Sequence, residues 1–529
     1  MFKFKLSWFG FVLFNSILIT LLNFNLHSFV YEKLSQNLLL TLVFIVAYFG
    51  LVHMIFSLIF VKYLTKILSI FFILSSCTSL YFITFYGVLI DSDMIQNVMQ
   101  TDIKEVKDLL SWRLVLLAIV VLLFCVFILR IRIENNTEQG FFKKIRVRVL
   151  SALLGCSIFL IAFVPLSKTF IPFFRTYNEI RMYNVPFYPI YAVYRYCVRF
   201  LKPKSEFKTI GDDAFRENNS SKKLLVLVVG ETARAANYSL GGYTKNDTNF
   251  YTNKNNVVFF DNFSSCGTAT AVSLPCMFSL SKRQNYSSSE YQENVMDILQ
   301  KTGVKASWID NNSGGCKGVC DRLSDKQQLS SDWDENLLPF LKERLGNLDT
   351  QNIIVLHLQG SHGPAYYKRY PIQGSHGPAY YKRYPNEFKK FIPTCDTNEL
   401  SKCDSEALIN TYDNTLLYTD YLLSEIIKLL KEKKDYESSL IYLSDHGESL
   451  GENGIYLHGM PYAIAPSYQT HIPVIFWSND KKLMMTAQNH KGLKLSQDNL
   501  FSTLLGYFDV KTMVYESDYD LLNQTLKAN

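Results

Sequence analysis

The sequence predicts an N-terminal five-helix transmembrane domain followed by a C-terminal α/β domain with a mainly parallel central sheet. Two observations predict this division. Long apolar runs are confined to about the first 170 residues of the 529-residue chain. Beyond residue 220, short apolar strand-like runs alternate with helical stretches, which is typical of a parallel sheet covered on both faces.

Five apolar stretches approach the roughly 20 residues that a helix needs to cross a bilayer. Lys3 and Lys5 precede the first stretch, as in a signal peptide, but four more stretches follow and no small-residue cleavage site is evident. We therefore expect a retained anchor and a transmembrane domain over residues 1–170. The stretches cover approximately residues 6–26, 38–61, 66–90, 113–130 and 147–167.

Basic residues in the loops between these stretches predict the orientation. Lys62 and Lys66 lie between the second and third stretches, and six basic residues lie between the fourth and fifth: Arg130, Arg132, Lys143, Lys144, Arg146 and Arg148. Because cytoplasmic loops are enriched in such residues, the N-terminus is predicted to be cytoplasmic and residues 171–529 to lie outside. This placement also explains the net charge of +7, so no nucleic-acid partner is expected.

The cysteines of the soluble part form three locally spaced pairs. This usage is typical of disulfides in an oxidising compartment. A zinc finger at 316–320 is disfavoured because no second pair follows at suitable spacing. The expected pairs are Cys266 with Cys276, Cys316 with Cys320, and Cys395 with Cys403.

Residues 171–204 are crowded with aromatic and basic side chains. This composition suits a segment in the lipid headgroup region; the alternative is a linker packed against the soluble domain. We therefore separate an interfacial helix or linker, 171–220, from a periplasmic catalytic domain, 221–529.

Polar residues follow three predicted strands of the α/β domain. Glu231 follows the strand at 224–229, Asp445 and His446 follow the strand at 440–443, and His362 follows the strand at 353–358. Sites in such sheets lie beyond the carboxyl ends of the strands. Carboxylate and imidazole groups are a suitable ligand set for Zn²⁺. Further strands are predicted at 257–259 and 472–477.

The segment between Cys266 and Cys276 offers three candidate nucleophiles, Thr268, Thr270 and Ser273. A disulfide would close this loop and hold a hydroxyl at the start of a predicted helix, where developing negative charge is favoured. Zinc on the same oxygen would favour the alkoxide. Residue chemistry alone does not choose among the three.

Residues 358–371 recur almost unchanged as residues 372–385. The repeat is too short for a solenoid, so a tandem duplication or an assembly error is the simplest explanation.

Several blocks resemble the lipid A phosphoethanolamine transferases, which include the mobile colistin-resistance enzymes, within the alkaline phosphatase/sulfatase superfamily. The resemblance covers nearly the whole chain and its motifs are long. It is carried by VVGETARAANYSLGGY (228–243), SCGTATAVSLPCMFS (265–279), GSHGPAYYKRY (360–370), YDNTLLYTD (412–420) and SDHGESLGENGIYLHGMP (444–461).

The resemblance implies that Thr270 is the nucleophile and that zinc is held by Glu231, Thr270, Asp445 and His446. It further implies roles for residues around the phosphoryl group. His362 and His458 would lie beside the phosphoryl group or a second zinc, Lys317 and Asn312 would lie near the site, and Glu448 would support the Asp-His pair. By the same resemblance, Asn97, Thr101 and Glu105 would meet the donor headgroup; the alternative is that these three form a solvated helical face.

The duplication departs from the family pattern, which has a single block. Either His362 or His376 could take the catalytic position. We favour His362 because it keeps its distance from the preceding strand. The surplus copy must bulge out as a loop, and activity is reduced if it does not.

The resemblance implies transfer of phosphoethanolamine from phosphatidylethanolamine to lipid A or another surface acceptor, through a covalent phosphothreonine. We expect a monomer in the bacterial inner membrane and lower susceptibility to cationic peptides such as polymyxin. The alternatives are a glycerophosphate or glycan-directed phosphotransferase and, from another class, a non-catalytic scaffold. A sulfatase is disfavoured because no C-x-P-x-R pattern surrounds Thr270.

Overall fold

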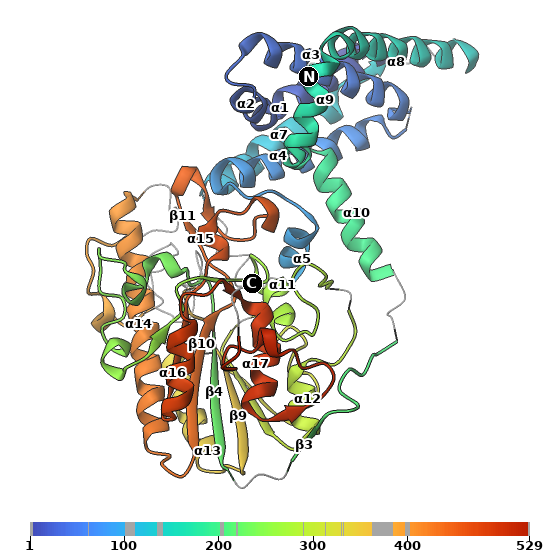
Figure 1. Cartoon of the computed structure of the whole chain (residues 1–529). Coiled ribbons are helices and arrows are strands. Elements are labelled where there is room, and N and C mark those ends of the chain that lie inside the picture. Colours follow the sequence, from blue (N-terminus) through green and yellow to red (C-terminus); the bar gives the residue numbers. More distant parts are fainter. Residues whose placement is uncertain are drawn as a thin grey trace. The chain divides into compact units, whose positions relative to one another are not determined.

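The chain forms two compact units, seen in Figure 1. One unit comprises Met1–Ile95 with Leu110–Val198, and the other comprises Gln96–Leu109 with Arg199–Asn529. The computed structural model describes residues 4–61, 63–100, 112–134, 141–201, 206–217, 221–288, 290–312, 314–329, 331, 333–361, 384–396 and 403–526.

The first unit is a bundle of apolar helices. Among the described residues, four helical segments are long and apolar enough to cross a membrane, and α1 with α2, bent by 53°, makes a fifth if the pair is one span. The expected count of five therefore holds with this pair included. The helices are α1 (Trp8–Leu22), α2 (Phe24–Lys33), α3 (Leu38–Ile59), α4 (Thr65–Tyr86), α7 (Trp112–Arg130), α8 (Phe141–Phe163) and α9 (Ser167–Thr176). Two more, α5 (Ser92–Gln100) and α10 (Phe187–Leu201), begin in this unit and end in the second.

The bend between α1 and α2 lies at Asn23, which makes long-range hydrogen bonds. Its side chain donates to the carbonyl of Val185 over 2.6 Å and accepts from the Val185 amide over 3.0 Å. The segment after α9 is therefore tied to the bend. Tyr48 adds a second tie, because its hydroxyl donates to Asn184 over 2.7 Å. The N-terminal unit thus includes part of the segment expected in the headgroup region.

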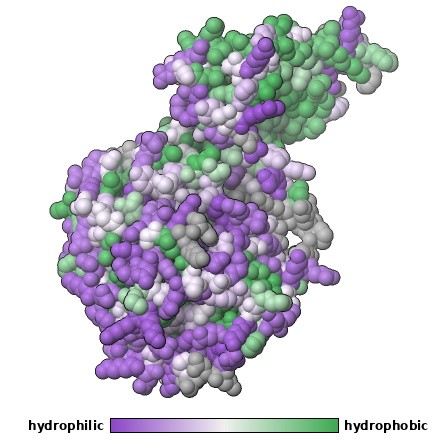
Figure 2. All heavy atoms as spheres, viewed as in Figure 1, coloured by the Kyte–Doolittle hydropathy of each residue, from purple (hydrophilic) through white to green (hydrophobic). Residues whose placement is uncertain are grey.

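Large apolar side chains gather on the surface of the N-terminal unit, as Figure 2 shows. Leu122, Leu123 and Ile161 are 64%, 64% and 75% exposed. Exposed apolar surface of this extent marks a membrane-facing region. Inside the bundle, α3 and α8 approach closely at Gly50 and Gly155, where an added Cβ on either residue would lie 2.8 Å from the other's carbonyl oxygen. Small residues permit such contacts between membrane helices.

The second unit is built on a central sheet. Its order in the described part of the chain is β5-β13-β10-β4-β9-β7-β8; β13 is antiparallel to both neighbours and the other pairings are parallel. The mainly parallel sheet is as expected. Its strands are β4 (Lys223–Gly230), β5 (Val258–Phe259), β7 (Lys305–Asp310), β8 (Asp325–Gln328), β9 (Gln351–His357), β10 (Glu437–Ser444) and β13 (Val474–Ser478).

Helices cover both faces of this sheet. Alternate β4 residues, Leu225, Leu227 and Val229, join a core with α11, α12, α16 and α17, while α13 and α14 contact β7, β9 and β10. Both faces of β4 are buried, which explains its continuous apolar sequence. The helices are α11 (Thr270–Met277), α12 (Val295–Lys301), α13 (Leu337–Leu345), α14 (Ser405–Lys431), α15 (Ser467–Thr470), α16 (Lys481–His490) and α17 (Leu500–Tyr507).

Short strand pairs and disulfides complete the units. The three predicted disulfides are present: Cys266–Cys276, Cys316–Cys320 and Cys395–Cys403. The pairs are β1 (Lys5–Ser7) with β2 (Arg132–Glu134), β3 (Phe215–Arg216) with β15 (Val510–Lys511), β6 (Phe263–Ser264) with β14 (Leu495–Ser496), and β11 (Ser449–Leu450) with β12 (Tyr456–Leu457).

Candidate active site

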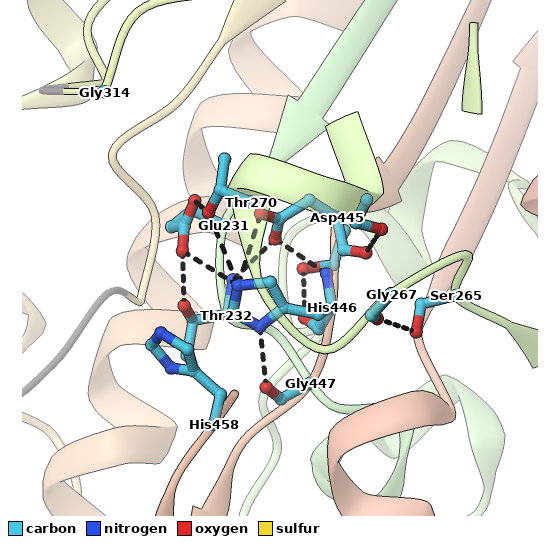
Figure 3. Close-up of polar contacts among 12 residues, drawn as sticks. Glu231, Thr232, Ser265, Gly267, Thr270, Gly314, Asp445, His446, Gly447 and His458 are labelled. Carbon is cyan, nitrogen blue, oxygen red and sulfur yellow. Dashed lines mark hydrogen bonds and ion pairs between the residues drawn. The ribbon is translucent and has the colours of Figure 1, made fainter. Parts of the chain in front are cut away.

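Glu231, Asp445 and His446 meet at the carboxyl ends of two adjacent parallel strands. Gly230 of β4 is paired with Ser444 of β10, so the residues that follow each strand become neighbours. All three side chains are at most 1% exposed. Figure 3 shows them converging on the first residue of α11.

Thr270 begins α11 and directs its hydroxyl at this cluster (Figure 3). Its Oγ1 donates to Glu231 Oε2 over 2.9 Å and lies 3.4 Å from His446 Nε2. The other two candidate hydroxyls donate to backbone carbonyls instead. Thr268 donates to the carbonyl of Met460, and Ser273 donates to the carbonyl of Asp445. The geometry thus favours Thr270 as the nucleophile.

A strained residue orients Glu231. Thr232 has φ of 59°, a region that β-branched residues rarely adopt. Its hydroxyl donates to Glu231 Oε1 over 2.6 Å, its amide donates to Asp445 Oδ1 over 3.1 Å, and its carbonyl accepts from Tyr412 over 2.8 Å. These three contacts hold the strained backbone and align the two carboxylates.

The cluster fits a metal ion. Glu231, His446 and His458 present ligand atoms within 4.8 Å of one another. Oδ2 of buried Asp445 has no hydrogen-bond partner in the described part of the chain and lies 3.4 Å from His446 Nε2. Buried carboxylate oxygens are costly unless a donor or a cation satisfies them. The oxygen and nitrogen donors suit Zn²⁺.

The pKa shifts in the cluster also favour a bound metal ion. Burial, reinforced by the charge of Glu231, raises the pKa of Asp445 to about 7. Burial lowers the pKa of His446, but Asp445 and Glu231 outweigh it and raise this pKa to about 10. Metal-free, the site therefore retains protons that a metal ion would displace.

Each imidazole is oriented through its Nδ1. His446 Nδ1 lies 2.9 Å from the carbonyl of Gly447, which turns Nε2 toward the carboxylates. His458 Nδ1 lies 2.9 Å from Oε2 of fully buried Glu448. The two rings are 4.3 Å apart between centroids. The contact of Glu448 with His458 is the arrangement that commonly fixes a ligand or catalytic histidine.

Asn312 and Lys317 follow β7. Asn312 Nδ2 donates to Glu231 Oε2 over 3.0 Å and to the carbonyl of Leu358 over 3.2 Å. Gly314 leaves room for the lysine head group, since a Cβ there would lie 2.8 Å from Lys317 Nζ. The same Cβ would lie 3.2 Å from Asn312 Oδ1, so the lysine head group and the Asn312 side chain both lie beside Gly314.

The other predicted site residues lie wholly or partly outside the residues that the structure describes. Asn97 lies in α5, and its side chain is outside the described residues. Thr101, Glu105, His362 and His376, with most of the repeat, are outside them too. The first residues of the repeat pass against the site, because a Cβ on Gly360 would lie 2.8 Å from the backbone of Glu231.

Arg234 is a site-supporting residue that the motifs did not single out. It is 3% exposed, stacks over Tyr468 at 4.7 Å, and donates to the carbonyl of Glu448 over 3.2 Å and to Glu452 over 2.6 Å. It therefore anchors the β11–β12 hairpin that precedes His458. The sequence signal that could have identified Arg234 is its position within the block 228–243, which resembles the family.

A second buried pair lies behind Asn312. His357 Nδ1 is 3.1 Å from Asp310 Oδ2, and Asp310 Oδ1 accepts from the Asn312 amide over 2.8 Å. The two residues face each other across β7 and β9. Sequence reasoning had no signal for this pairing, which arises from strand register.

The parallel sheet and the hydroxyl facing an acid–histidine cluster are consistent with the fold of the sulfatase family. The sulfatase family model matches residues 223–510, and the model for phosphoethanolamine transferase EptA/EptB matches residues 48–200.

Individual relatives agree across the whole chain. Phosphoethanolamine transferase EptA of Escherichia coli (strain K12) is 40% identical over 512 residues, covering 92% of this chain and 90% of that protein. The integral membrane lipooligosaccharide phosphoethanolamine transferase A of Neisseria meningitidis is 30% identical, with a TM-score of 0.90 over 99% of this chain and 100% of that one. The C-terminal periplasmic domain of phosphoethanolamine transferase EptC from Campylobacter jejuni is 80% identical, with a TM-score of 0.57, covering 61% of this chain and 99% of that one. The chain therefore belongs to the phosphoethanolamine transferase family, which confirms the resemblance seen in its motifs.

Proposed function

We propose that this protein transfers phosphoethanolamine from phosphatidylethanolamine to lipid A or a related lipooligosaccharide, through a covalent intermediate on Thr270. The hydrogen bond from Thr270 Oγ1 to Glu231, beside His446, carries this proposal. The family names a phosphoethanolamine donor activity, and one relative's name includes a lipooligosaccharide acceptor.

Zinc is the proposed cofactor, held by Glu231, Asp445, His446 and the Thr270 oxygen. When bound, it would polarise the threonine and phosphoryl oxygens. Asp445 Oδ2, which has no hydrogen-bond partner among the described residues, supports this donor set. His458 lies close enough to Glu231 and His446 to join it; in the alternative arrangement, His458 and His362 serve a second ion.

In the first step, the Thr270 oxygen attacks the phosphorus and the phosphorus–oxygen bond to diacylglycerol breaks. Glu231 accepts the Thr270 proton along the hydrogen bond already present, and His458, oriented by Glu448, protonates the departing diacylglycerol oxygen. Lys317, Asn312 and the start of α11 face the charge on the nonbridging oxygens.

In the second step, an acceptor phosphate oxygen attacks the phosphorus of the phosphothreonine and gives its proton to His458. The bond from phosphorus to Thr270 breaks, and the threonine oxygen regains its proton from Glu231. The product carries an added ammonium group, which offsets lipid A phosphate charge and weakens the binding of cationic peptides such as polymyxin.

We place the protein in the bacterial inner membrane with the domain 221–529 in the periplasm, the domain 1–170 as its anchor and 171–220 at the interface. The positive-inside pattern, the three disulfides and the periplasmic domain of the EptC relative support this orientation. Tethering holds the site near two lipid substrates and raises their effective concentration.

Transfer between defined lipids tests the proposal. The full-length protein is incubated with lipid A in vesicles containing either phosphatidylethanolamine or phosphatidylglycerol, and lipid products are identified by mass spectrometry. Phosphoethanolamine-modified lipid A and diacylglycerol, formed only with phosphatidylethanolamine, are expected. Glycerophosphate transfer from phosphatidylglycerol would instead favour the alternative phosphotransferase, and no transfer from either lipid would contradict the proposal.

A further inference from the structure

A buried glutamine joins the nucleophile segment to the strand that carries the Asp-His pair. Gln497 lies in a short turn between β14 and α17 and is fully buried. Its Oε1 accepts from the Cys266 amide over 2.6 Å and from Ser273 Oγ over 2.7 Å. Its Nε2 donates to the carbonyls of Ser444 and Asp445 over 2.8 and 2.9 Å.

These four contacts use the full donor capacity of the amide and both acceptor positions of its oxygen. Two of them bracket Thr270: Cys266 lies four residues before it and Ser273 three residues after it. The other two bind the last residue of β10 and the residue that follows it. Gln497 therefore bridges the two halves of the site without a described contact to Thr270 or His446.

Ser273 closes the same bridge a second time. Its single hydroxyl hydrogen is shared between two acceptors, the Asp445 carbonyl at 2.5 Å and Gln497 Oε1 at 2.7 Å. The Cys266–Cys276 disulfide closes the loop that holds both partners and Thr270. A capping box between Ser496 and Asn499 fixes the turn around Gln497 itself, so the amide is presented from a rigid support.

We propose that Gln497 is a positioning residue that sets the distance between the Thr270 hydroxyl and the Asp445–His446 pair. The inference rests on the proposed role of Thr270. Losing the two Nε2 donors leaves two buried carbonyls with fewer partners, and a shift of about 1 Å between reacting groups is enough to lower a rate by about 100-fold.

The test compares Gln497→Glu with Gln351→Glu in the full-length protein. Gln351 is a suitable control because it is also buried, donates from Nε2 to the carbonyl of Ser221 over 2.6 Å, and lies at the opposite end of the sheet. Zinc affinity is measured by chelator competition without substrate. The rate of phosphoethanolamine loading onto Thr270 is measured at saturating phosphatidylethanolamine, and thermal unfolding is followed in parallel.

Gln497→Glu is expected to weaken zinc binding by about 10-fold and to slow Thr270 loading by about 100-fold. Gln351→Glu is expected to lower the unfolding temperature while leaving zinc affinity and loading rate within about two-fold of wild type. Ser273→Ala, which removes one contact to the amide, provides a milder variant if Gln497→Glu does not fold, with an expected reduction in loading of about 10-fold.

Gln497→Glu with wild-type zinc affinity and loading rate would overturn the inference, as would folded Ser273→Ala with an unchanged loading rate. Because zinc affinity is measured without donor lipid, a wild-type protein that forms no adduct would count against the proposed function and leave the zinc comparison as the test of Gln497.

Discussion

The hydroxyl of Thr270 donates a hydrogen bond to Oε2 of Glu231 over 2.9 Å, although the two residues lie 39 positions apart in the chain. The contact exists because β4 delivers Glu231 to the carboxyl edge of the sheet and α11 begins at the same edge. The contact places a hydroxyl at the first position of a helix beside a carboxylate, the arrangement of nucleophile and base that the proposed covalent transfer uses.

Glu448 is expected to act through His458. Glu448→Gln removes the negative charge 2.9 Å from His458 Nδ1 and so weakens the proton transfer to diacylglycerol. We predict a fall in kcat of about 10- to 100-fold with KM for phosphatidylethanolamine little changed, measured by diacylglycerol release. Glu437→Gln, at the start of β10 away from the site, is the control; equal effects of both substitutions would contradict the assignment.

The metal-free protein is expected to lose stability as pH rises. The pKa of Asp445 is raised to about 7 by burial and by Glu231, so the folded state favours the protonated acid over the ionised one. The stabilising preference for the proton is present below the unfolded-state pKa of about 4 and disappears as pH rises through 7. His446, whose pKa is raised to about 10 by the two carboxylates despite burial, adds a change of the same sign at higher pH.

Thermal unfolding after chelation, at pH 6 and pH 8, measures this effect. The unfolding temperature of the wild type should be lower at pH 8, and Asp445→Asn should reduce the difference. With zinc, the dependence should reverse, because binding displaces these protons and tightens as pH rises. The prediction is refuted if the metal-free wild type has a higher unfolding temperature at pH 8 than at pH 6, and if Asp445→Asn shows the same difference between the two pH values.

Arg234 is expected to stabilise the hairpin before His458. Arg234→Met removes the ion pair with Glu452 and the donor to the Glu448 carbonyl. The expected loss in free energy of unfolding is about 3 kcal/mol, in the range for breaking one side of a buried ion pair. Denaturant unfolding of the full-length protein measures it.

Arg344→Met is the matched control, since Arg344 also pairs with a carboxylate, Asp325, but far from His458 along the sheet. It should reduce stability without slowing diacylglycerol release, whereas Arg234→Met should do both. Identical catalytic effects of the two substitutions would show that Arg234 has no specific role in holding His458.

The strand ends could be predicted because local sequence carries the information. The continuous apolar run at 224–229 followed by Glu231 indicates a buried strand and its polar end without any long-range knowledge. The helical spans were predictable for the same reason. In contrast, β8 is short and polar with alternating exposure, so its sequence does not distinguish it from a loop.

Other features depend on tertiary contacts that spacing does not show. Gln497 reaches back 231 residues to the Cys266 amide, and Asp310 meets His357 through strand register. The bend at Asn23 reflects hydrogen bonds to Val185, 162 residues away. The resemblance implied a zinc set of Glu231, Thr270, Asp445 and His446, and one grouping of ligand atoms in the described residues joins His458 to Glu231 and His446.

In the proposed mechanism, Thr270 carries the phosphoethanolamine group from donor to acceptor. The decisive experiment is an intact-mass measurement of the purified full-length protein after incubation with phosphatidylethanolamine, beside Thr270→Ala. We predict one phosphoethanolamine adduct on the wild type and none on the variant, with diacylglycerol released only by the wild type. An adduct of equal yield on Thr270→Ala, or a zinc-loaded wild type that releases diacylglycerol without any adduct, would contradict the account.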